Sequence, residues 1–303
     1  MKHLLFVLGI LTLPTSAAAQ DVVTPSKSTR VATLEDTRIK ESSGLTPSQV
    51  ESGVFWTLND SGGEPCVFAI DIHGHTRAKA RLAGAVNFDW EDLCSGRDEK
   101  GRPVLYIGDI GDNLRIRRTL QIYQIAEPRL VADGLRAPEI ITEAPVVWHV
   151  SYPDGAHNAE GLLVHPKTRR IHLLTKSEDG KSSLYAFPAS VPDDGKPVIL
   201  EKVAGITFPG YPRTGKRIVD DRMCTGAAFS PDGSRLVAST YSSLYEWPLP
   251  AGTTLANALA KRPVRLVPDL LRQLEAVCYD PDGRTLWITS EHLPTPLVKI
   301  TRD

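Results

Sequence analysis

Three glutamates occupy the same place in three similar stretches of the sequence. Glu91 lies in the segment DWEDL, Glu160 in NAEGL and Glu275 in QLEAV. Each glutamate follows an acidic or amide residue by two positions and precedes a short apolar stretch. Carboxylate and amide oxygens are the ligands that hard cations such as calcium and magnesium prefer. The sequence therefore contains a candidate metal site made of Glu91, Glu160, Glu275 and Asn158.

These carboxylates also allow a second interpretation, in which no resident ion is bound. Carboxylates that are brought together repel one another unless water, protonation or a metal ion compensates their charge. The same side chains could line a solvated channel and bridge neighbouring strands through water. Both interpretations stay open from the sequence alone.

The three glutamates belong to a unit that occurs five times. Ser43 in ESSGL and Thr225 in MCTGA take the equivalent place, so the five positions are 48, 69, 65 and 50 residues apart. We call these five residues the anchors. After each anchor an apolar strand, a polar turn and a second strand with a polar end follow. Two of these turns contain Pro-Asp-Gly, which is typical of a tight hairpin.

The repeated unit predicts the fold. Four short strands per unit at this period are typical of the blades of a β-propeller. The fifth unit ends after its third strand, and the segment 29–35 is an apolar strand that belongs to no unit. We therefore expect an all-β, five-bladed β-propeller closed by the N-terminal strand. The alternative is a six-bladed ring with an unrecognised blade in the interval 91–160.

The predicted blades bring a second set of polar residues to the anchors. The first strand of a blade lines the central channel, and the second strand runs antiparallel to it. The start of the first strand and the end of the second strand therefore lie at one face. The residues that we expect to bind a ligand at this face are Asn59, Asp60, Asp109, Asp112, Asn113, Lys176, Tyr241, Glu291 and His292.

Two histidines are candidates for a general acid or base. His157 lies three residues before Glu160, and His292 ends the last of the second strands. Imidazole titrates near neutral pH, which suits such a role, but a lone histidine is more often a structural residue of the surface or core. The motifs GxSxG, HExxH and GxGxxG do not occur in the sequence. The catalytic residues, if there are any, stay unknown at this level.

The N-terminal segment predicts export. Residues 1–19 have a basic start, an apolar run over 4–13 and an Ala-x-Ala end, as in a secretory signal peptide. We expect a signal peptide (1–19), an N-terminal extension (20–28) and a single propeller domain (29–303), in the periplasm or secreted. Disulfides persist there, and we expect Cys66 to pair with Cys94 and Cys224 with Cys278.

The charge balance limits the partners. The chain has 35 Lys and Arg residues against 36 Asp and Glu residues, for a formal net charge of -1. Without a polybasic stretch, nucleic acid is not an expected partner, and no stretch after the N-terminal segment is long enough to span a membrane. We expect a monomer that binds a small molecule, a polymer or an extracytoplasmic protein.

Several short motifs carry a resemblance to known proteins. The segments ESSGL, FWTLNDSGG, WEDL, LYIGDIGDN, AEGL and LEAVCYDPDGRTLWITSE resemble exported bacterial propellers of the SdiA-regulated and esterase-like-phytase kind. More distantly, the chain is similar to calcium-dependent lactonase and gluconolactonase propellers, which hold a channel cation with Glu, Asn and Asp. This resemblance implies that Glu91, Glu160 and Asn158 stand at metal-binding positions, whereas Ser43 and Thr225 depart from the pattern.

Two classes of function follow. The first is an exported module that binds a ligand or partner at the polar face of the channel, with or without a divalent cation. The second is a metal-dependent hydrolase of phosphoesters, lactones or esters, in which the cation polarises the substrate and activates water. The fold does not choose between them, because propellers host many functions.

Overall fold

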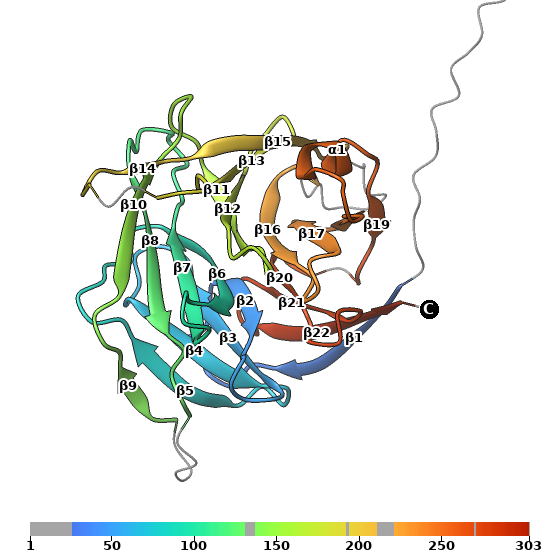
Figure 1. Ribbon diagram of the computed structural model, residues 1–303. Coiled ribbons are helices and arrows are strands. Elements are labelled where there is room, and N and C mark those ends of the chain that lie inside the picture. Colours follow the sequence, from blue (N-terminus) through green and yellow to red (C-terminus); the bar gives the residue numbers. More distant parts are fainter. Residues whose placement is uncertain (1–25, 131–136, 192–193, 211–220, 270, 303) are drawn as a thin grey trace, which may run out of the picture.

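The computed structural model describes residues 26–130, 137–191, 194–210, 221–269 and 271–302. The strands in these residues form five sheets that surround a central channel as blades (Figure 1). Blade one contains β2 (Ser42–Pro47), β3 (Val54–Asn59), β4 (Cys66–Asp71), β5 (Thr76–Arg81) and β9 (Glu139–Ile141). Blade two contains β6 (Trp90–Arg97), β7 (Pro103–Asp109), β8 (Leu120–Ala126), β10 (Val146–Ser151) and β14 (Val198–Ile199).

The other three blades have four strands each. Blade three contains β11 (Ala159–Val164), β12 (Ile171–Thr175), β13 (Lys181–Ala186) and β15 (Glu201–Thr207). Blade four contains β16 (Cys224–Phe229), β17 (Arg235–Thr240), β18 (Leu244–Pro248) and β19 (Val264–Leu266). Blade five contains β20 (Leu274–Tyr279), β21 (Leu286–Ser290), β22 (Pro296–Arg302) and β1 (Ser26–Thr33).

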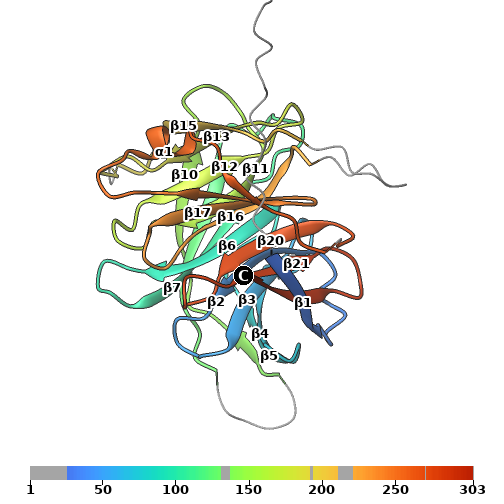
Figure 2. The ribbon, with the colours of Figure 1, turned by 90° about the vertical axis from the view of Figure 1, so that its right-hand side faces the viewer.

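The N-terminal strand closes the ring, as the sequence predicts. β1 pairs antiparallel with β22, from Ser26 opposite Arg302 to Thr33 opposite Pro296 (Figures 1 and 2). The strand already begins at Ser26, within the segment expected to be an extension. The expected signal peptide (1–19) lies outside the described residues.

The ring has five blades rather than six. Each innermost strand contacts the innermost strand of the next blade, in the closed order β2, β6, β11, β16, β20 and back to β2. The described part of the interval 91–160 contains no additional sheet. Its strands β7, β8 and β10 complete blade two, and β9 adds to the outer edge of blade one. The six-bladed alternative is therefore wrong.

Apolar side chains fill the spaces between neighbouring blades. Each of five buried clusters joins residues of two adjacent blades. Successive side chains of a strand point to opposite faces of its sheet, and each sheet is covered on both faces by a neighbouring blade. The core is therefore distributed around the ring, and the inner edge of each sheet is left to face the channel.

The four cysteines are free thiols. Cys66 and Cys278 pack in the cluster between blades five and one. Cys94 packs against the cluster between blades two and three. Cys224 belongs to the cluster between blades three and four. The expected pairs Cys66 with Cys94 and Cys224 with Cys278 are wrong, because the partners lie in different interfaces.

Helical structure is limited to one short element in the described residues. The helix α1 (Leu255–Leu259) follows Thr254, whose side chain accepts a hydrogen bond from the Asn257 amide and so caps the helix. Within the described chain, no helix has the length and apolar character needed to cross a membrane.

Candidate functional site

The anchor of every blade lies at a β-bulge of the innermost strand. The register between the first and second strands shifts at Ser43, Glu91, Glu160, Thr225 and Glu275. A bulge adds an unpaired residue and re-aims its side chain. All five side chains are buried, with exposed fractions of at most 3%. The five blades therefore present one bulge residue each at the same end of the channel.

The register also places the polar ends of the second strands beside the anchors. The residue just before each anchor pairs with the last polar residue of the neighbouring strand. These second-strand residues are Asn59, Asp109, Thr175, Thr240 and Ser290. We call the end of the channel that carries Asp60, Asp89, Glu91, Glu160, Glu275 and Glu291 the acidic mouth.

Three carboxylates of the acidic mouth form a tight group. One oxygen each of Asp60, Asp89 and Glu91 lies within 4.8 Å of the other two. Asp60 follows β3, Asp89 precedes β6, and Glu91 is the bulge residue of β6. Glu91 is only 3% exposed. Among the described residues, no hydrogen bond reaches a carboxylate oxygen of Asp89 or Glu91.

The environment of this group disfavours negative charge. Burial raises the pKa of Glu91 well above its usual range, and the charges of Glu160, Asp60 and Asp89 raise it further. Burial raises the pKa of Asp89 to about 6, with Asp60 as the next cause. A divalent cation among these oxygens would supply the missing positive charge, and hard oxygen donors suit calcium or magnesium.

Gly111 makes this close approach possible. A Cβ atom at position 111 would overlap Oε1 of Glu91 and Oδ2 of Asp89. The amide of Gly111 also donates a hydrogen bond to the carbonyl of Asp89, at 3.1 Å. A side chain at this position would therefore displace the ends of the Glu91 and Asp89 side chains.

The other half of the acidic mouth contains its own cation. Lys176 Nζ lies 2.9 Å from Glu160 Oε1 and 5.1 Å from the centroid of the Tyr241 ring. Burial lowers the pKa of Lys176, but the charges of Glu160 and Glu275 outweigh this effect and leave the pKa raised. Lys176 is therefore charged and compensates these two glutamates. The tight carboxylate group joins Glu91 to Asp60 and Asp89, and Glu160 is the charge that acts most strongly on Glu91.

Asn158 acts as a link between loops in this structure. Its Oδ1 atom accepts a hydrogen bond from the Asp112 amide at 2.7 Å, and its Nδ2 atom donates to Asn113 Oδ1 and Glu160 Oε1. The Asp112 carboxylate accepts bonds from the amides of Ile116 and Arg117 and so closes the 112–117 turn. Asn158 Oδ1 thus accepts one backbone hydrogen bond and, as a carbonyl oxygen, keeps a second lone pair.

Asp109 and Asn59 are engaged in similar structural contacts. Asp109 forms an ion pair with Arg117 at 2.6 Å and accepts a hydrogen bond from the Phe88 amide. The guanidinium of Arg117 lies over the Phe88 ring, 4.9 Å from its centroid. Asn59 accepts a hydrogen bond from the Glu41 amide. These residues fix the loops around the carboxylates, and the sequence analysis did not single out Arg117.

Gln273 joins two glutamates of blade five. Its Nε2 atom donates to Glu275 Oε1 at 2.7 Å and to Glu291 Oε2 at 2.5 Å. Burial raises the pKa of Glu291 to about 7, with Asp60 as the next cause. Burial also raises the pKa of Glu275 well above its usual range, and its buried Oε2 atom has no hydrogen-bond partner among the described residues.

The two candidate histidines do not contact the acidic mouth in the described structure. His157 Nε2 lies 3.0 Å from Asp154 Oδ1 and 3.0 Å from the Tyr185 hydroxyl. His292 is exposed, and its backbone has a φ of 68°, in the left-handed region. Its amide donates to the carbonyl of Lys40.

Asp92 is a buried carboxylate that the sequence analysis missed. It is 4% exposed, its Oδ1 atom accepts a hydrogen bond from Leu93 N, and its Oδ2 atom accepts one from Leu162 N of blade three, both at 2.8 Å. Asp92 thus satisfies amides on the inner edges of two blades. A signal was present in the repeat, because the equivalent position is small in the other four blades: Gly44, Gly161, Gly226 and Ala276.

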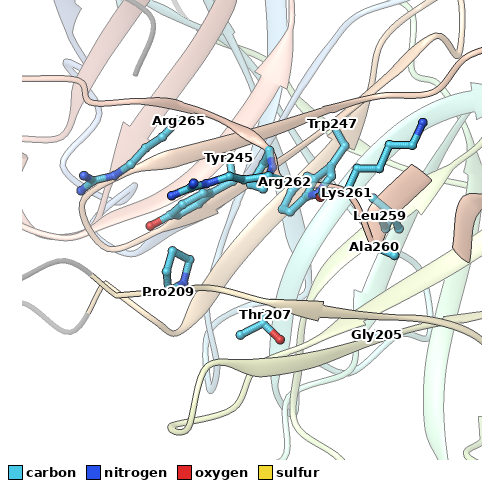
Figure 3. Close-up of a pocket in the computed structure, with 11 residues that line it drawn as sticks. Gly205, Thr207, Pro209, Tyr245, Trp247, Leu259, Ala260, Lys261, Arg262 and Arg265 are labelled. Atoms are coloured by element: carbon cyan, nitrogen blue, oxygen red, sulfur yellow. The ribbon is translucent and has the colours of Figure 1, made fainter. Parts of the chain in front are cut away.

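A separate hollow lies on the flank of the ring between blades three and four (Figure 3). Its volume is about 350 Å³, and β15, β18 and the segment after α1 line it. Arg265 in this hollow forms an ion pair with Asp221 at 3.0 Å. None of the carboxylates of the acidic mouth lines this hollow, so it is distinct from the site.

The fold and the site define a five-bladed β-propeller with a carboxylate-rich channel mouth. No protein-family model matches the chain, and no curated protein matches its sequence. Among solved structures, it is similar to a gluconolactonase from Xanthomonas campestris, with 13% identity, a TM-score of 0.44, and coverage of 86% of this chain and 72% of that chain.

A second similar structure is a chain of the mitotic checkpoint complex, with 13% identity and a TM-score of 0.40. That match covers 85% of this chain but only 62% of the other, which is less than two thirds of its length. Structural similarities this distant do not indicate the activity of this chain.

Proposed function

We propose that this propeller binds an oxygen-bearing ligand at the acidic mouth through a calcium or magnesium ion held by Asp60, Asp89 and Glu91. Glu91 carries the proposal. Its carboxylate is 3% exposed and accepts no hydrogen bond from the described residues, yet it faces two further carboxylates within 4.8 Å. Such an arrangement is costly unless a positive charge compensates it.

Three protein carboxylates leave room for a ligand on the ion. Calcium takes six to eight oxygen ligands, and magnesium takes six and commonly keeps several waters. Oxygen atoms of a small molecule, a polymer or an extracytoplasmic protein can therefore complete the coordination. We place this binding in the periplasm or outside the cell, in line with the predicted signal peptide.

The surroundings of the ion site favour a ligand that also has an apolar part. Phe88 and Leu114 are 65% and 79% exposed, and Ile116 is 71% exposed. Phe88 directly precedes Asp89, and the loop with Leu114 and Ile116 directly follows Gly111. Both loops are joined through Arg117, which contacts the Phe88 ring and the carbonyl of Gly111.

Calorimetry and thermal unfolding with calcium chloride or magnesium chloride test the proposal. We expect saturable binding and a rise in melting temperature for the parent, because an ion that binds only the folded state stabilises it. Glu91→Gln should lose at least tenfold in affinity. Glu99→Gln makes the same charge change at an exposed turn residue and should behave like the parent. If neither ion changes the melting temperature of the parent, the metal site is refuted.

A second candidate function is metal-dependent hydrolysis of a phosphoester, lactone or ester. Glu291 favours it, because Gln273 holds this carboxyl at the acidic mouth and burial raises its pKa to about 7, near the optimum for a general acid or base at neutral pH. The motif resemblance to esterase-like phytases makes phosphoesters the first substrates to test. The ion would polarise the substrate and activate water.

Turnover assays separate the two functions. A hydrolase should lose its activity with a chelator, and Glu291→Gln should lower kcat by about 100-fold while calcium binding is retained. A pure binding module should bind the ion and turn over none of the three substrate classes. Activity that persists in the Glu291→Gln variant would remove Glu291 from the reaction.

A further inference from the structure

A second cavity lies at the end of the channel opposite the acidic mouth. Its volume is about 660 Å³, within the range of small-molecule sites. It is lined by the ends of β6, β11, β16 and β20 and by the turns after the innermost strands. The anchors lie at the starts of these same strands, so the two sites are at opposite ends. We call this site the lower cavity.

The wall of the lower cavity is mainly apolar. Leu162, Val164, Phe229 and the thiols of Cys94 and Cys278 contribute to it. Val164 is 8% exposed and Cys278 is 2% exposed, so this surface is concave rather than a protruding patch. Four prolines complete the wall: Pro47, Pro166, Pro231 and Pro281.

The charged groups of the lower cavity are all basic. Among the described residues that line it there is no aspartate or glutamate, whereas Arg97, Arg169 and His165 are present. Arg97 donates to the carbonyl of Gly101 at 2.8 Å, and Arg169 donates to that of Asp98 at 3.1 Å. Neither guanidinium is ion-paired with a carboxylate in the described chain. Both retain N–H groups for an anion.

The carboxylates around the cavity are already bonded. Glu127 accepts hydrogen bonds from Ser48 and Gln49, and Glu246 accepts one from the Tyr279 hydroxyl. The Asp98 carboxylate forms an ion pair with Arg102 at 2.6 Å. His165 Nδ1 accepts hydrogen bonds from the amides of Lys167 and Thr168, at 3.3 and 3.2 Å. This assigns the proton of the neutral ring to Nε2, which can serve as a donor. The side chains of Arg97, Arg169 and His165 thus keep donors that no carboxylate of the described residues occupies.

Asp92 directly follows the anchor Glu91 and accepts a hydrogen bond from the amide of Leu162, which lines the lower cavity. The Asp92 carboxylate joins blades two and three. The lower cavity shares no residue with the carboxylate group of Asp60, Asp89 and Glu91, and the charged side chains that line it are basic.

We propose that the lower cavity binds a small apolar molecule with an anionic head, such as a medium-chain carboxylate. The apolar chain contacts Val164, Phe229 and the prolines, and the carboxylate lies at Arg97 and Arg169. Apolar surface provides the affinity, and the two arginines select the anion over the corresponding alcohol.

Calorimetry with octanoate and 1-octanol tests this site on the full chain. We expect one octanoate per chain and at least fivefold weaker binding of 1-octanol. The double variant Arg97→Ala/Arg169→Ala changes two exposed residues and should weaken octanoate binding at least fivefold while leaving 1-octanol unchanged. Ala228→Phe, which places a large ring in the cavity, should weaken both ligands at least tenfold.

Glu91→Gln is the control at the opposite end and should bind octanoate like the parent. The proposal fails if the parent binds neither compound, if the double arginine variant binds octanoate as well as the parent does, or if Glu91→Gln abolishes octanoate binding. Failure of calcium binding would leave these results unaffected, because the two sites share no residue.

Discussion

Lys176 and Glu160 form an ion pair at 2.9 Å, so one side of the acidic mouth contains a cation of the protein itself. On one side, the lysine ammonium compensates Glu160 and Glu275. On the other side, Asp60, Asp89 and Glu91 have no such cation within hydrogen-bond distance in the described chain. Lys176 supplies a positive charge to the carboxylates on one side, and a bound ion would supply it to those on the other side.

Replacement of the lysine tests this division. Lys176→Gln should lower the free energy of unfolding by about 3 kcal/mol, because it leaves buried Glu160 without its charge partner. Added calcium should then restore part of the loss. Denaturant unfolding with and without calcium measures both effects. Lys181→Gln, at an exposed lysine, should change stability by less than about 0.5 kcal/mol. Unchanged stability of Lys176→Gln would contradict the assignment.

The glycine beside the carboxylates gives a second prediction. Gly111→Ala should reduce calcium affinity by at least tenfold, because the new methyl group displaces Glu91 Oε1 and Asp89 Oδ2. The matched control is Gly101→Ala, where a Cβ atom meets nothing within 4 Å, although its φ of 77° makes that change mildly destabilising. Calcium affinity by calorimetry should remain at the parent value in this control.

Ring closure by β1 predicts the effect of truncation. A chain that starts at Leu34 lacks β1 and exposes the edge of β22, so its melting temperature should fall by about 10 °C or more. A chain that starts at Ser26 keeps the strand and is the control. Equal melting temperatures for the two chains would show that β1 does not close the ring in solution.

Burial of His172 should lower the stability of the folded chain in acid. Its side chain is buried against Phe229, Nδ1 has no hydrogen-bond partner in the described structure, and burial lowers the pKa to about 3, with a smaller effect of Arg170. The unfolded chain therefore binds the proton first as pH falls below about 6.5, so stability present above this pH is lost toward pH 3.

His172→Leu isolates this contribution from that of the carboxylates with raised pKa, whose effect on stability has the opposite sign. Between pH 7.5 and 5, the parent should lose about 2 kcal/mol more than the variant. His73→Gln changes an exposed histidine and should follow the parent. Urea unfolding at both pH values measures the difference, and parallel pH profiles for parent and His172→Leu would rule the effect out.

The buried carboxylate between blades two and three gives a fifth prediction. Asp92→Asn should cost about 1–3 kcal/mol, because the amide nitrogen replaces one acceptor and faces a backbone N–H donor. Hydrogen exchange should show faster exchange at the Leu162 amide than in the parent. An Asn variant as stable as the parent would mean that neither bond contributes.

Much of the fold could be predicted because every blade repeats the same short sequence pattern. The anchors, the Pro-Asp-Gly turns and the orphan N-terminal strand each follow from short-range sequence patterns. The pairing of β9 and β14 could not be predicted, since both are only two or three residues long and they join the edges of neighbouring blades in parallel.

The composition of the acidic mouth was predicted in outline, but its pairing was not. The repeat predicts that Glu91, Glu160 and Glu275 share one end of the channel. It does not predict that Lys176 compensates two of them, nor that Asp60 from another blade joins Glu91. Such contacts depend on side-chain reach across blades, and no regularity within one repeat encodes them.

The common bulge gives the channel five positions with the same backbone geometry, one in each blade. Backbone geometry is repeated from blade to blade, whereas the side chain at the bulge varies between serine, threonine and glutamate. Charge at the channel can therefore be added or removed one blade at a time without rebuilding a strand. Ser43 and Thr225 are the two bulge positions that carry no charge, and their hydroxyl groups instead bond to Glu91 O and Ser239 Oγ.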